Sequence, residues 1–142
     1  MAWVFQENRL GQSQPGDVDT DQKVPLGTIL RAYDPTYGSG EFIYLQGVAS
    51  TAVGSWVLYN PDDFSTSLLA GDDIGPVAVA TAATVASTYG WYQISGKGQA
   101  KMAASTADNS ALYIDGTAGL ADDDTVAGDR IMGAKAAAAA DS

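Results

Sequence analysis

The sequence predicts an all-β protein: a small antiparallel β-sandwich or barrel of about eight short strands, with an extended N-terminal arm. Three observations predict this class. Short runs rich in β-branched and aromatic residues recur at roughly 8–15 residue intervals. Glycine, proline, asparagine and aspartate separate these runs, and no stretch sustains a helical period. The length of 142 residues is that of a single domain.

The expected strands are bounded by turn signals, such as Asp34-Pro35. The Ala-rich stretch 78–86 is interpreted as a strand followed by a loop, because it follows Gly75-Pro76 and contains several β-branched residues. The eight expected strands are residues 28–33, 41–46, 56–60, 76–81, 90–95, 99–103, 111–114 and 130–134.

Residues 1–25 are expected to form the N-terminal arm. A polar leader containing proline and glycine, without helical or strand periodicity, follows a short apolar tip made of Trp3, Val4 and Phe5. We expect this tip to dock on a neighbouring subunit or on a larger assembly, as aromatic anchors do at interfaces. The alternative is that Trp3 and Phe5 belong to a first strand, because short apolar runs are ambiguous.

Residues 26–135 are expected to form the β domain, and residues 136–142 a flexible C-terminal tail, since five alanines cannot hold a helix alone. A weak internal repeat divides the domain. At an offset of 54 residues, each half contains a strand ending in tyrosine, an Asp-rich turn, and a strand entered through a glycine turn. The matches are Leu58 with Leu112, Tyr59 with Tyr113, Val77 with Ile131, and Ala80 with Ala134.

Charge and composition exclude several classes of partner. Seven Lys and Arg residues against 17 Asp and Glu residues give a formal charge of −10, which cannot supply the basic face that nucleic acid requires. No apolar run reaches the length of a membrane helix. The N-terminus lacks the basic region of a signal peptide, and the chain has no cysteine. We therefore expect neither a nucleic-acid nor a membrane partner, and assembly in the cytoplasm.

The absence of histidine and cysteine removes the usual catalytic triads, imidazole proton shuttles and zinc sites. A glycosidase-like carboxylate pair is formally possible, but nothing singles out such a pair. The acids cluster beside turn residues, where aspartate bonds its own backbone and stays solvated. We expect no enzyme, no catalytic residue and no cofactor. The clusters are Asp62-Asp63, Asp72-Asp73 and Asp122-Asp123-Asp124.

Asp17, Asp19 and Asp21 have the alternate spacing that lets carboxylates converge on calcium. An EF-hand loop would then need glycine and glutamate at its sixth and twelfth positions, which are Gln22 and Thr28. A solvated acidic loop is the favoured interpretation, and a weak calcium site is the alternative.

Trp91 and Tyr92 are neighbours in an expected strand, so their side chains point to opposite faces. One is expected in the core and the other at the surface or an interface. We take Trp91, together with the apolar tip, as a candidate interface residue. A carbohydrate platform built on Trp56 or Trp91 is the alternative.

Four segments of the chain, residues 47–60, 74–80, 90–96 and 127–130, resemble the small capsid decoration (cement) proteins of tailed bacteriophages. In that family a Gly-x-Trp/Val-Val-x-Tyr strand is followed by Pro-Val-Ala-Val-Ala and by an aromatic Trp-Tyr-Gln-x-x-Gly strand. The resemblance covers about residues 27–135 and rests on the general pattern rather than on a diagnostic motif. Residues 1–25 have no clear counterpart.

The resemblance implies a structural virion protein that binds the outer surface of a phage capsid in many copies and stabilises the shell. The implied partners are the major capsid protein and neighbouring copies of this chain. The implied location is the virion, after assembly in the host cytoplasm, and the family has no active site to transfer. Two alternatives stay open: a head-fibre or tail-associated virion protein, and a carbohydrate-binding β module.

Overall fold

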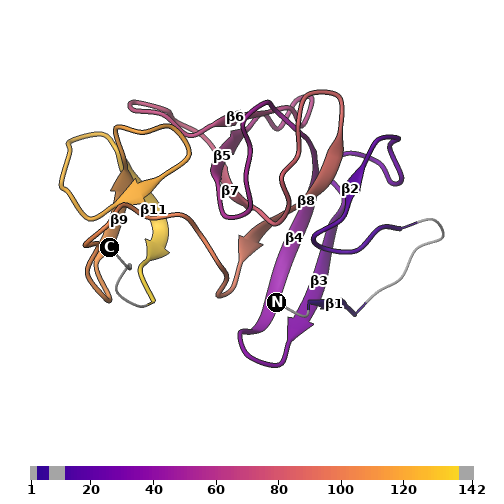
Figure 1. Ribbon diagram of the computed structural model, residues 1–142, viewed down its shortest axis with the longest axis horizontal. Helices are drawn as coiled ribbons and strands as arrows, with labels where there is room; N and C mark the ends of the chain where they lie inside the picture. The colour runs from indigo at the N-terminus through magenta and orange to yellow at the C-terminus, as the bar shows by residue number, and fades with distance from the viewer. Residues whose placement is uncertain (1–2, 7–11, 138–142) are drawn as a thin grey trace.

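The computed structural model describes residues 3–6 and 12–137, and these residues form eleven strands and no helix (Figure 1). The predicted all-β class is confirmed. The rest of the expected arm and tail lies outside the described residues. The strands are β1 (Val4–Phe5), β2 (Val18–Asp19), β3 (Ile29–Asp34), β4 (Gly38–Gln46), β5 (Trp56–Tyr59), β6 (Thr66–Leu68), β7 (Val77–Ala80), β8 (Tyr89–Ser95), β9 (Ala111–Ile114), β10 (Ala121–Asp122) and β11 (Arg130–Lys135).

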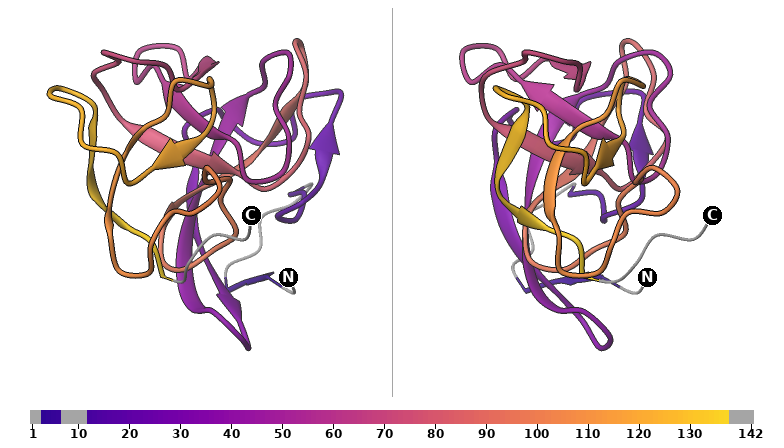
Figure 2. Two further views of the ribbon diagram at one scale, coloured as in Figure 1. Left: turned by 60° about the vertical axis from the view of Figure 1, so that its left-hand side comes forward. Right: turned by 90° about the vertical axis from the view of Figure 1, so that its left-hand side faces the viewer.

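Two antiparallel sheets build a sandwich-like fold. The large sheet has the order β1-β3-β4-β8-β7-β5-β6, and β2 also pairs with β8. The small sheet has the order β10-β9-β11 and lies in front of the large one when the molecule is turned by 90° (Figure 2). Trp56 and Leu69 from the β5–β6 end pack against Leu112 and Ile131 of the small sheet, so the two sheets share one apolar cluster.

Strand β4 is buried on both of its faces. Phe42 and Tyr44 point into one apolar cluster, whereas Ile43 and Leu45 point into another. Alternating side chains of a strand occupy opposite faces, so this near-continuous burial means that both faces of the sheet are covered. The centre of the large sheet, β4 with β8, is therefore the interior of the molecule.

Trp91 and Tyr92 of β8 do point to opposite faces, as predicted, but both are buried, with 1% and 0% of their surfaces exposed. The indole Nε1 of Trp91 also donates a hydrogen bond of 3.1 Å to Oγ of Ser13. The prediction that Trp91 lies at an interface is therefore wrong. The reason is that the N-terminal segment covers the face on which Trp91 lies, which strand periodicity alone does not reveal.

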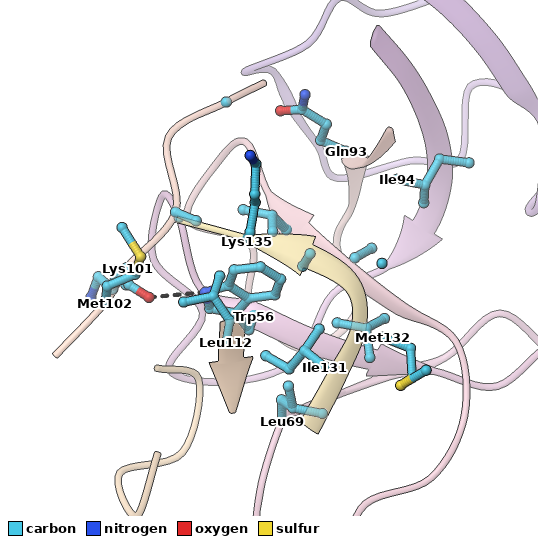
Figure 3. Close-up of a pocket in the computed structure, with 18 of the residues that line it drawn as sticks. Trp56, Leu69, Gln93, Ile94, Lys101, Met102, Leu112, Ile131, Met132 and Lys135 are labelled. Carbon is cyan, nitrogen blue, oxygen red and sulfur yellow. Dashed lines mark hydrogen bonds between the residues drawn. The ribbon is translucent and has the colours of Figure 1, made fainter. Parts of the chain in front are cut away.

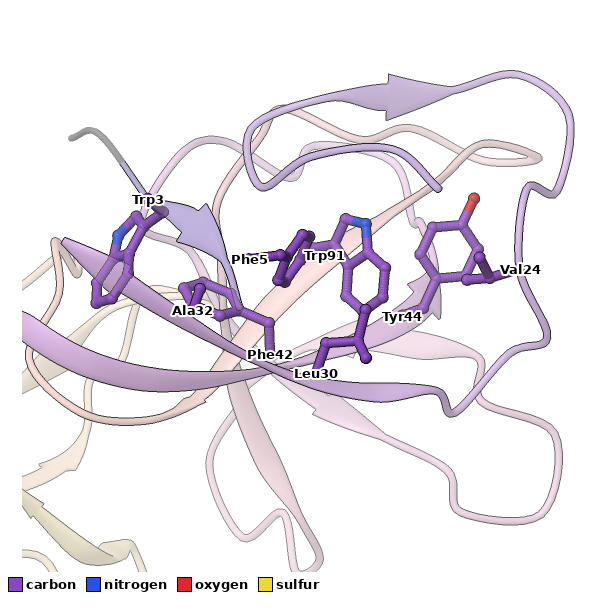
Figure 4. Packing of buried hydrophobic residues seen from close by; sticks show 8 residues of the cluster. All are labelled: Trp3, Phe5, Val24, Leu30, Ala32, Phe42, Tyr44 and Trp91. Carbon is purple, nitrogen blue, oxygen red and sulfur yellow. The ribbon is translucent and has the colours of Figure 1, made fainter. Parts of the chain in front are cut away.

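The apolar tip packs into the chain's own core rather than standing free (Figure 4). Strand β1 pairs with β3, which places Val4 opposite Tyr33. Trp3 and Phe5 are buried, and the ring of Phe5 lies 4.7 Å from that of Trp91 between centroids. The structure therefore contains the alternative, a first strand. Successive side chains of a strand point to opposite faces, so Trp3 and Phe5 both point inward. Of the three tip residues, Val4 alone is exposed.

A second contact holds the N-terminal segment on the sheet. The phenol of Tyr44 donates a hydrogen bond of 2.7 Å to Oδ2 of Asp19, and the hydroxyl of Ser13 donates one of 2.6 Å to the same oxygen. Strand β2 pairs with β8 at Val18 and Asp19. The described part of residues 1–25 is thus an integral layer of the domain, not an extended arm.

The internal repeat corresponds to a repeated arrangement of strands. Strand β5 lies between β6 and β7, and β9 lies between β10 and β11. Tyr113 is opposite Arg130 in the small sheet, and the 54-residue offset maps this pair onto Tyr59 and Pro76. The backbone N–H of Tyr59 donates to the carbonyl oxygen of Pro76 at 3.1 Å, so the two units have the same register at this point.

Two expected boundaries differ from the structure. Residues 99–103 form no strand of a sheet: Met102 makes one isolated parallel bridge with Ala121. Ala136, expected in the flexible tail, is buried and hydrogen-bonds through its backbone to Ser110 and Asn109, both at 3.0 Å. The ordered domain therefore extends past residue 135.

Candidate functional site

A groove of about 1430 Å³ lies between β11 of the small sheet and the ends of β7 and β8 in the large sheet (Figure 3). We call it the β8–β11 groove. Trp56, Leu112 and Ile131 form its apolar floor, and all three belong to the cluster that joins the sheets. The groove is therefore the open side of the contact between the two sheets.

The floor is held rigidly by backbone contacts. The indole Nε1 of Trp56 donates a 2.9 Å hydrogen bond to the carbonyl oxygen of Lys101, drawn as a dashed line in Figure 3. The backbone of Trp56 also donates to Gly119 and accepts from Leu69. Since the large sheet, the loop between β9 and β10 and the 99–103 segment all bond this residue, its position is preorganised.

Two apolar side chains stand at the groove with most of their surface in solvent. Ile74 is 91% exposed and Met132 is 82% exposed. The register of β11 shifts between Arg130 and Lys135, and Gly133 has a φ of 75°, a backbone conformation that favours glycine. This bulge interrupts the alternation of β11, whose residues 132 and 133 are both exposed. Exposed side chains of this size usually mark a surface that contacts something else when they gather together.

Positive charge is concentrated at this groove. Of the seven cationic residues of the chain, four line it, whereas its lining includes a single acid, Asp73. The Asp73 carboxylate accepts a 2.9 Å hydrogen bond from the backbone N–H of Ala70. The lining thus carries a formal charge of +3. The rest of the chain carries −13, which gives the total charge of −10. The four cations are Lys97, Lys101, Arg130 and Lys135.

A second exposed apolar surface lies on the outer face of β1 and β3. Val4 is 62% exposed and lies opposite Tyr33, which is 48% exposed. Ile29, further along β3, is 50% exposed, and the intervening residues of β3 point inward or are charged. We call Val4, Ile29 and Tyr33 the outer strip. It is the exposed counterpart of the core face that Trp3 and Phe5 occupy.

The aromatic residues suggested for carbohydrate binding are poorly placed for it. A sugar platform needs an accessible ring face, but Trp91 is buried and Trp56 keeps 7% of its surface exposed. The polar edge of each indole is already used, by Ser13 for Trp91 and by Lys101 for Trp56.

The acidic loop suggested for calcium does not assemble a site. Oδ2 of Asp17 accepts a 2.9 Å hydrogen bond from the N–H of Gln14, and Oδ2 of Asp19 accepts from Tyr44. Within residues 3–6 and 12–137, no group of three or more His, Cys, Asp or Glu side chains is arranged to hold a metal ion. The same residues contain no helix long and apolar enough to cross a membrane.

Most of the acidic clusters serve turns, as predicted. Oδ1 of Asp63 accepts hydrogen bonds from the N–H and hydroxyl of Ser65, which lowers its pKa. Asp122 differs, since it lies on β10 beside Asp115. Burial and the hydrogen bond that protonated Asp122 donates to Asp115 raise the pKa of Asp122 to about 6, while the backbone N–H of Thr117 lowers that of Asp115.

No family model, curated protein or solved structure matches the chain. Sequence reasoning missed the β8–β11 groove, because its lining comes from five separate strands and their loops. The available signal was the spacing of cations, since Lys97 and Lys101 flank one turn and Arg130 and Lys135 bound one strand.

Proposed function

We propose that this chain is a structural virion protein that binds the outer surface of a phage capsid and stabilises the shell. The sequence pattern that resembles decoration proteins supports the proposal. Its three central segments contribute β5, β7 and β8, which lie side by side in the large sheet although they are distant in sequence. The pattern thus corresponds to three adjacent strands of one sheet.

The observation that carries the proposal is the outer strip. Val4 and Tyr33 are paired on an edge of the sheet, with Ile29 on the same face of β3. Their neighbours Trp3 and Phe5 fix this edge in the core, so the strip, in which the exposed Arg31 separates Ile29 from Tyr33, is a rigid surface that needs little ordering on binding. Such a surface is suited to contact with a protein shell.

Repetition supplies the affinity in this proposal. A shell presents the same contact many times, and contacts between neighbouring copies turn weak single contacts into stable occupancy. The role is structural and non-catalytic: copies bridge major capsid subunits and resist their separation. The copies assemble on the shell in the host cytoplasm and remain on the virion.

The test compares binding of purified variants to mature shells that lack this protein. Tyr33→Asp places a charge in the outer strip and is expected to weaken binding by tenfold or more, equivalent to about 1.4 kcal/mol. Val85→Asp is the matched control, because Val85 is 51% exposed and outside the strip. Bound wild-type protein should raise the temperature at which the shells break.

Two results would contradict this proposal. Shells that retain no wild-type protein would exclude decoration. Equal binding by the Tyr33→Asp and Val85→Asp variants would exclude the outer strip as the contact surface.

A further inference from the structure

We propose that the β8–β11 groove binds an extended acidic segment of a partner protein, in which carboxylate side chains alternate with apolar ones. This inference concerns a surface separate from the outer strip and does not depend on binding to a capsid. It rests on three properties of the groove: its size, its apolar floor and its charge.

The size and the floor favour a peptide. Small-molecule sites usually enclose about 300–1,000 Å³, and the groove exceeds that range at about 1430 Å³. Its accessible apolar residues include Ile74, Met102 and Met132, whereas Trp56 and Ile131 beside them keep 7% and 5% of their surfaces exposed (Figure 3 labels all but Ile74). An extended chain places every second side chain on one face, so alternate apolar residues would contact the exposed side chains of Ile74 and Met132.

The charge selects an acidic segment. Lys97 and Lys101 come from the loop after β8, and Arg130 and Lys135 from the two ends of β11. Two separate segments of the chain therefore bring cations to the groove, and all four cations are exposed. Carboxylates on the partner would meet them at the rim, where charge complementarity steers association and sets specificity.

Side-chain recognition, rather than addition of a strand to the sheet, fits the backbone. Strand β11 is an edge strand of the small sheet, but its bulge breaks the regular row of hydrogen-bonding groups that strand addition needs. The apolar floor also favours a protein segment over a nucleic acid, whose backbone would bring phosphate without apolar side chains.

The first experiment titrates the whole protein with synthetic ten-residue peptides by calorimetry. The probe alternates Asp and Val; one comparison peptide alternates Lys and Val, and another alternates Asp and Ser. We expect the Asp-Val peptide to bind and both comparison peptides to bind at least tenfold more weakly. No binding of the Asp-Val peptide at about 1 mM, or equal binding of the Lys-Val peptide, would overturn the proposal.

Matched charge reversals locate the site. Lys101→Glu and Arg130→Glu are expected to weaken binding of the Asp-Val peptide by at least tenfold each. Lys23→Glu makes the same change in net charge at an exposed position outside the groove and should have less than a twofold effect. Thermal unfolding of each variant checks that the fold is retained, and Met132→Ser tests the groove without changing charge.

Three further results would overturn the proposal. An equal loss in Lys23→Glu would mean that overall charge governs binding. Unchanged binding by both groove reversals would place the peptide elsewhere. Binding of a ten-nucleotide single-stranded DNA as tight as that of the Asp-Val peptide would show a general anion site. None of these results bears on shell binding, because the groove and the outer strip share no residue.

Discussion

The hydroxyl of Tyr44 donates a buried hydrogen bond of 2.7 Å to the carboxylate of Asp19, joining β4 at the centre of the large sheet to β2 in the N-terminal segment. Burial, with the adjacent Asp19 carboxylate, raises the pKa of Tyr44 well above its ordinary value, so the phenol remains a donor over the whole working range of pH. This bond explains how a polar leader becomes a layer of the core.

Tyr44→Phe is expected to destabilise the domain by about 1.5–3 kcal/mol, because the variant removes a hydrogen bond to a carboxylate in a buried site. Tyr33→Phe is the control: Tyr33 is half exposed, so its effect should stay within about 0.5 kcal/mol. Chemical denaturation at pH 7 measures both. Equal stabilities of the two variants would mean that the Asp19 contact does not anchor the segment.

Substitutions in the apolar tip should differ in their effect on stability, because some of its side chains point into the core and one points into solvent. Phe5→Ala is expected to cost about 3 kcal/mol or more, since it removes a buried ring that packs on Trp91. Val4→Ala should change the free energy of unfolding by less than about 0.5 kcal/mol, because Val4 faces solvent. Thermal unfolding measures the stability of both variants. A Phe5→Ala protein as stable as the wild type would mean that the tip is a free arm and does not stabilise the core.

Asp122 should make stability depend on pH. Its pKa is raised to about 6 in the folded protein, chiefly by burial and then by the hydrogen bond with Asp115. A raised pKa favours the protonated form in the folded state, so this group's contribution is complete below its ordinary pKa of 3.8 and is lost as pH rises through about 6.

Asp122→Asn should therefore raise stability at pH 7 by about 1 kcal/mol, an amount reduced by solvent screening of a partly exposed pair. The gain should vanish at about pH 4, where Asp122 is already protonated in the folded protein. Asp62→Asn removes one carboxylate at an exposed turn outside this pair and is the matched control. Thermal unfolding across this range measures the difference, and a gain that grows toward low pH would contradict the assignment.

The class of fold could be predicted because strand periodicity and turn chemistry are local. The segments containing Leu30 and Leu112 alternate and end at turn residues, and each forms a strand. The two- and three-residue strands could not be predicted, since so short a run has no measurable period. The burial of Trp91 was missed because it depends on a layer supplied by Ser13 and Phe5, about 80 residues away in sequence.

The candidate sites show the same limit. Val4 was in the predicted interface set, and it is exposed. Tyr33 lies opposite Val4 in the pair of β1 and β3, and this pairing depends on a strand register that the sequence does not reveal. The groove needs Trp56 and Ile131 to meet between two sheets. Such a meeting is a tertiary contact that no local pattern encodes.

The proposed decoration role predicts that this chain is present on purified phage particles, and quantitative mass spectrometry of such particles is its most direct test. The measurement counts copies of the chain for each copy of the major capsid protein. A decoration role predicts a fixed ratio of the two chains, with many copies on each particle that are lost together when the shell surface is stripped. A handful of copies that stay with the tail or fibres, or none at all, would contradict it.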